Sequence, residues 1–144
     1  MINNTGVGAY KNQQINTMPP ERLTLMLYDG AIRFTKEAIM GIENNIAPKD
    51  INEASIKAQN IIREFVCTLK VDVNPELAEG YLKLYDYIEY ELRQGVFKHE
   101  KIHFENALLV LQELREAWFE AMKIAKGIGQ PAASAVAGTV DFGK

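Results

Sequence analysis

The sequence has one cysteine, Cys67, and only two histidines, His99 and His103. A single cysteine cannot form an intrachain disulfide, so packing alone must hold the fold, as is usual in a reducing cytosol. Two histidines are also too few to complete most zinc sites or to activate a nucleophile. We therefore expect Cys67 to be a small, half-buried residue of a helix.

Long apolar runs and an excess of positive charge are missing as well. No stretch approaches the ~18 apolar residues of a membrane-spanning helix, and the first residues show no charged and apolar export signal. The net charge is -3, with acidic and basic residues mixed along the chain, so no basic stripe could follow a phosphate backbone. The sequence predicts a cytoplasmic protein without nucleic-acid binding or membrane insertion.

Helical periodicity dominates the middle of the chain. Four amphipathic segments are expected at about 20–44, 50–69, 75–97 and 101–126, separated by loops rich in proline, glycine and asparagine. Helices of this length joined by short loops favour an all-α, antiparallel four-helix bundle. The predicted domain organisation is a flexible arm (1–19), the bundle (20–127) and a disordered tail (128–144).

Details of the pattern predict the helix ends and the buried lines. Asp50, with Glu53 three residues later, has the spacing of a capping box, and Asn74 can cap a helix that Pro75 opens. The predicted buried line of the first helix is Leu23, Leu27, Ala31, Phe34, Ala38 and Ile42. The predicted buried line of the third is Leu77, Tyr81, Leu84, Ile88 and Leu92.

The first and third helices carry more apolar residues than a bundle core needs. From Leu23 to Ile42, 12 of 20 positions are apolar, whereas one face requires about three in seven. The surplus lies on an adjoining face that includes Leu25, Tyr28 and Ile32. Exposed apolar and aromatic surface on such a protein usually marks a protein partner.

Leu-Tyr-Asp occurs twice, at 27–29 and 84–86, without the wider similarity of an internal repeat. The periodicity predicts both leucines in the core, both tyrosines at its border and both aspartates toward water. Either tyrosine alone is best explained as the edge of a wide core. The chain has six tyrosines, and four of them lie within one ten-residue stretch of the third helix, 81–90. The full set favours partner binding.

The sequence contains few residue patterns that could form an enzyme active site. Glu100 to His103 forms one Glu-x-x-His motif, but a di-iron bundle requires two, together with further glutamates. No phosphate-binding loop and no catalytic serine arrangement is recognisable. We expect a binding protein without cofactor, metal or catalysis. A bundle metalloprotein and a homo-oligomer formed through the second apolar face remain the alternatives.

The order and spacing of several motifs resemble the FliS family of flagellar secretion chaperones. The resemblance covers about 7–118 and rests on VGAY (7–10), TMPPE (17–21), LTLMLYDGAI (23–32), AQNII (58–62), LYDYI (84–88) and LREAW (114–118).

The resemblance implies a chaperone that binds the C-terminal segment of flagellin, prevents its premature polymerisation and delivers it to the flagellar export apparatus. It leaves open whether other flagellar regulators also bind. The partner-binding residues expected from the resemblance and the apolar surplus are Val7, Tyr10, Leu25, Tyr28, Asp29, Gly30, Ile32, Leu84, Tyr85 and Asp86.

Overall fold

A computed structural model describes residues 19–69 and 74–128 and contains four helices. They are α2 (Pro20–Glu43), α3 (Pro48–Thr68), α4 (Pro75–Lys98) and α5 (Lys101–Ile128). The all-α four-helix prediction is confirmed. Most of the predicted arm and tail, with Val7 and Tyr10, lies outside the described residues.

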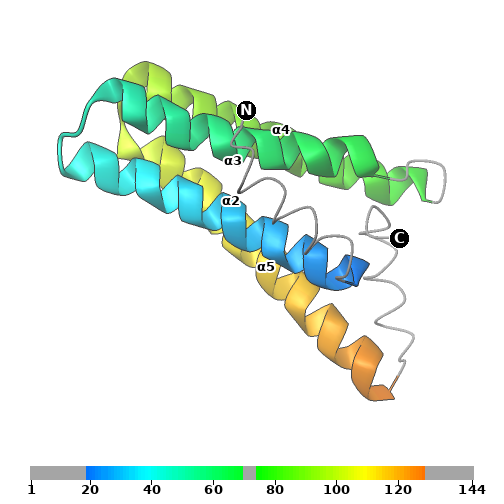
Figure 1. The fold of residues 1–144 in the computed structure, drawn as a ribbon. Coiled ribbons are helices and arrows are strands. Elements are labelled where there is room, and N and C mark those ends of the chain that lie inside the picture. The colour runs from blue at the N-terminus through cyan, green and yellow to red at the C-terminus, as the bar shows by residue number, and fades with distance from the viewer. Residues whose placement is uncertain (1–18, 70–73, 129–144) are drawn as a thin grey trace, which may run out of the picture.

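The helices pack in a ring in which each has its most extensive contacts with two others. α2 packs against α3 and α5, and α4 packs against the same two helices. Figure 1 shows α2 beside α5 on one side and α3 beside α4 on the other, while the C-terminal part of α5 diverges from α3 and α4. Neighbours along the chain run antiparallel, as the short connections predict.

Proline opens three of the helices. Pro20, Pro48 and Pro75 stand at their starts, where a missing N–H costs nothing. The predicted cap at Asn74 is confirmed, because its side chain accepts a hydrogen bond from the Leu77 amide at 3.2 Å. The predicted capping box at Asp50 is wrong: α3 begins earlier, at Pro48, and Asp50 lies in its first turn.

The buried line of α2 is displaced by about one residue from the predicted one. Thr24, Leu25, Tyr28, Ala31, Thr35, Ala38 and Gly41 are buried, whereas Leu27 and Phe34 are only partly buried. Thr24 and Thr35 tolerate burial because their hydroxyls donate to the carbonyls of Pro20 and Ala31, at 3.2 and 2.8 Å. A pattern read from hydrophobicity alone passes over these threonines.

The same displacement occurs in α4. Ala78, Tyr85, Ile88 and Leu92 are buried there, whereas Leu84 is 38% exposed. The prediction is correct for Ile88 and Leu92 and wrong for Leu84. In α3, the apolar side chains Ile51, Ala54, Ala58 and Phe65 are buried. Cys67, expected to be half-buried, is exposed.

Gly95 lies where α4 packs closely against Phe104 of α5. A Cβ atom at this position would lie 2.6 Å from the Phe104 ring, and that ring is fully buried. The helices can approach this closely only because residue 95 has no side chain. Gly80, in the same helix, has no atom within 4 Å of an added Cβ.

These two glycines supply a matched test of the packing. Gly95→Ala should lower the free energy of unfolding by roughly 1–3 kcal/mol, because the buried Phe104 ring must move. Gly80→Ala should raise it by roughly 0.5–1 kcal/mol, because alanine favours a helix and meets nothing. Urea unfolding followed by circular dichroism measures both. Equal effects of the two substitutions would contradict the close approach.

Candidate partner-binding site

Tyr28 and Tyr85 face each other across the core. Their hydroxyl oxygens lie 3.3 Å apart, and the side chains are 1% and 0% exposed. The Phe65 ring lies 4.5 Å from the Tyr28 ring and stacks on the Tyr85 ring at 5.7 Å, measured between centroids. The three rings therefore connect α2, α3 and α4 in one aromatic layer.

The prediction that these tyrosines border the core was wrong. Burying Tyr28 and Tyr85 requires each helix to rotate so that the preceding leucine turns outward, since successive residues differ by about 100°. The hydroxyls contact each other instead of water. The two Leu-Tyr-Asp motifs thus contribute the two halves of one buried pair.

Burial also determines the ionisation of the pair. Removal from water raises the pKa of both hydroxyls well above the usual value, and for Tyr85 the nearby Tyr28 adds to the effect. Both groups are therefore neutral at physiological pH. The O···O distance is long for a hydroxyl pair, so ring packing stabilises the layer more than the hydrogen bond does.

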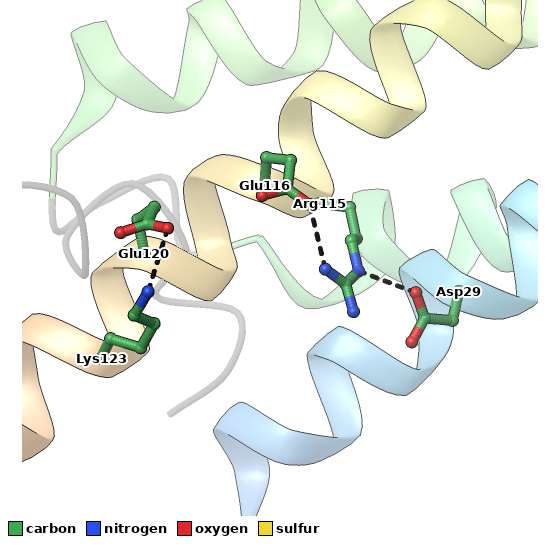
Figure 2. Close-up of polar contacts among 5 residues, drawn as sticks. All are labelled: Asp29, Arg115, Glu116, Glu120 and Lys123. Carbon is green, nitrogen blue, oxygen red and sulfur yellow. Dashed lines mark hydrogen bonds and ion pairs between the residues drawn. The ribbon is translucent and has the colours of Figure 1, made fainter.

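Asp29 turns out of the core and contacts α5. Its carboxylate accepts a hydrogen bond from Arg115 Nε at 2.9 Å, and Arg115 Nη1 also contacts Glu116 at 3.1 Å (Figure 2). Pairing with Asp29 is the main cause of a raised pKa for Arg115. The aspartate of the second motif, Asp86, is exposed, as predicted. Only the first motif therefore makes this link to α5.

A cleft of about 430 Å³ opens between α2 and α5 around this ion pair. Its lining combines one apolar residue with charged and amide side chains: Asp29, Ile32, Lys36, Gln112, Arg115 and Glu116. We call it the α2–α5 cleft. Ile32 offers apolar contact and the other side chains offer hydrogen bonds and charge, which suits a partner segment of mixed polarity.

The structure distributes the other expected site residues between core and surface. Leu25 is 8% exposed and belongs to the core. Gly30 faces α3, where an added Cβ would lie 3.2 Å from Ile61 Cδ1. Leu84 and its neighbour Tyr87 are exposed on α4. Of the described predicted residues, Asp29 and Ile32 share the α2–α5 cleft, whereas Leu84 and Asp86 do not line it.

Sequence reasoning missed the α5 side of this cleft. Arg115 and Gln112 lie on the partly buried border of α5, which a search for apolar lines does not mark. The signal was present in the LREAW motif, which contains Arg115 and Trp118. Trp118 Nε1 donates to the Glu21 carbonyl at 2.8 Å and so joins α5 to the start of α2.

The histidine motif forms a structural contact. His103 is largely covered and lies 2.8 Å from the Glu91 carboxylate, which also accepts from Asn106 at 3.2 Å. Within 19–69 and 74–128, no group of three or more His, Cys, Asp or Glu side chains is placed to hold a metal. Over the same residues, no helix has the length and apolar character to cross a membrane.

The described residues form an all-α four-helix bundle with a cleft between two of its helices, an architecture that suits a binding protein. A profile of the flagellar protein FliS family matches residues 2–125, and the chain belongs to this family. Proteins of this family are chaperones and not enzymes, so the function is that of a flagellar export chaperone.

Two relatives are flagellar secretion chaperones FliS. The one from Bacillus subtilis (strain 168) is 36% identical over 115 residues, which is 80% of this chain and 84% of the relative. The one from Campylobacter jejuni (strain 81116) is 27% identical over 120 residues, which is 83% of this chain and 93% of the relative.

A double-mutant cycle tests the hydroxyl contact. Tyr28→Phe and Tyr85→Phe should each lower the free energy of unfolding by roughly 0.5–1 kcal/mol, because each removes the hydrogen bond. The double variant should lose about 0.5 kcal/mol less than the two single losses combined. Urea unfolding of the four proteins measures this coupling. Strict additivity would show that the hydroxyls do not interact.

Alkaline pH should destabilise the fold through the same pair. When pH rises past about 10, the unfolded chain loses these protons while the folded chain keeps them. Below that pH, ionisation of the pair therefore leaves the free energy of unfolding unchanged. Above it, stability should fall by up to roughly 1.4 kcal/mol per pH unit for each tyrosine. Urea titrations at several pH values should give a shallower fall for Tyr28→Phe/Tyr85→Phe than for the parent, and parallel curves would contradict the assignment.

Proposed function

We propose that this chain binds the C-terminal segment of flagellin in the cytoplasm, keeps it from premature polymerisation and delivers it to the flagellar export apparatus. The expected mode is a partner segment that lays apolar anchors into clefts between the helices. Membership of the FliS family supports a flagellar partner. The α2–α5 cleft, which combines Ile32 with charged and amide side chains, is the observation that supports binding of a peptide segment.

The expected site residues divide into two roles in this proposal. Asp29, Ile32, Leu84 and Asp86 would contact the partner, because their side chains lie in the cleft or at the surface. Four others would act indirectly, by fixing the positions of the helices. They are the buried Leu25, Tyr28 and Tyr85, and Gly30 at the α3 interface. Val7 and Tyr10 remain proposed arm contacts outside the described residues.

Ile32 is the best position for a direct test, because a partner's apolar side chain would pack on it. Ile32→Ser should weaken binding of a synthetic flagellin C-terminal peptide by more than about tenfold, through loss of an anchor contact. Lys36→Glu, at the exposed rim of the same cleft, should also weaken binding. Isothermal titration calorimetry measures both, with circular dichroism to verify that the variants remain folded.

Leu109→Ser serves as the matched control. Leu109 lies on α5, is 59% exposed and does not line the cleft, so its substitution should leave the affinity unchanged. If the parent protein shows no heat of binding to the peptide, flagellin is not the client. If the peptide binds but Ile32→Ser and Lys36→Glu bind as well as the parent, the client lies on another face.

A further inference from the structure

A second cleft lies at the end of the bundle where α2 passes into α3. It has a volume of about 390 Å³ and is lined by Glu37, Met40, Gly41, Asn44, Ile46, Asp50, Glu53, Ala54 and Lys57. None of these residues lines the α2–α5 cleft. We call it the α2–α3 end cleft.

The large apolar side chains of this cleft are exposed to solvent. Met40 is 57% exposed and Ile46 is 40% exposed, although both are large apolar side chains that gain by leaving water. Ile46 is fixed over the helix because Gly41 has no side chain: an added Cβ there would lie 2.8 Å from Ile46 Cδ1. The loop therefore presents Ile46 beside Met40 on a formed surface.

The charges around these side chains are strongly unbalanced. Three carboxylates, from Glu37, Asp50 and Glu53, face a single ammonium group, that of Lys57. Over the described ranges 19–69 and 74–128, none of these three carboxylates forms an ion pair or a side-chain hydrogen bond. Lys57 itself lies over the Phe34 ring, 5.5 Å from its centroid. Three carboxylates against one ammonium group leave the cleft lining with a net negative charge around exposed apolar atoms.

We propose that the α2–α3 end cleft binds a basic amphipathic segment of a second partner protein. An apolar side chain of that segment would pack on Met40 and Ile46, while flanking lysine or arginine side chains pair with Glu37 and Glu53. Charge complementarity selects this partner, because an acidic segment would add to the repulsion between the carboxylates. The inference does not rest on the proposed client, whose site lies along α2 and α5.

Two designed peptides serve as probes. Both carry leucine at helical spacing; one has lysine at the flanking positions and the other has glutamate. We expect the basic peptide to shift the backbone amide signals of Gly41, Asn44 and Ala54 in NMR titrations of the full chain, and the acidic peptide to leave them unchanged. Binding of the basic peptide should weaken as salt is raised, because exposed charges are screened.

Variants locate the interaction. Glu37→Gln/Glu53→Gln should weaken the basic peptide by roughly fivefold, as expected for two exposed ion pairs, and Met40→Ser should weaken it as well. The control Glu79→Gln/Glu120→Gln makes the same change in charge on α4 and α5, outside this cleft, and should leave binding unchanged. A flagellin peptide should bind these variants like the parent, so failure of this inference is separable from failure of the proposed client.

Three results would overturn the inference. The first is that the basic peptide shifts signals on another face, or none at all. The second is that the control variant weakens binding as much as Glu37→Gln/Glu53→Gln does, which would indicate general attraction to an acidic protein. The third is a dimer in light scattering that Met40→Ser dissociates, because the occupant would then be a second copy of this chain.

Discussion

The aromatic layer of Tyr28, Phe65 and Tyr85 determines how α2 and α4 are rotated within the bundle. Because each helical residue turns by about 100°, burying Tyr28 directs Asp29 away from the core, toward α5. Asp29 then meets Arg115, and Ile32, one turn later, lines the α2–α5 cleft. The candidate site is thus a geometric consequence of a buried contact that no partner would touch.

This dependence explains how far the sequence could predict the molecule. The number of helices and the cap at Asn74 follow from periodicity and proline placement, which are local signals. The rotation of α2 could not be predicted, because it depends on buried threonines that satisfy their own hydroxyls and on a tyrosine whose partner lies 57 positions away. The α5 side of the α2–α5 cleft was missed for the same reason, since Arg115 becomes part of it only when α2 is rotated so that Asp29 faces α5.

Polar side chains in the core further restrict the register of α4. Ser55 Oγ donates to the Leu92 carbonyl at 3.0 Å and accepts from Gln59 Nε2 at 3.0 Å. On the other side of α4, Glu91 holds His103 and Asn106 of α5. A sliding or rotated α4 would leave these buried groups without partners, at a cost of about 1–3 kcal/mol for each. Apolar packing tolerates such displacement more easily, so these polar contacts select one of the helix arrangements that apolar packing alone would allow.

The α2–α5 cleft combines an exposed ion pair in its lining with a buried aromatic layer in the core beneath. The Asp29 and Arg115 side chains are 52% and 26% exposed, and a surface pair of this kind contributes only about 0–1 kcal/mol. A partner that offers its own carboxylate to Arg115 can therefore replace Asp29 with little loss. The aromatic layer beneath lies in the core and would not need to move. If the α2–α5 cleft receives the client as proposed, the contacts that exchange on binding and release are weak, whereas those that shape the cleft are strong.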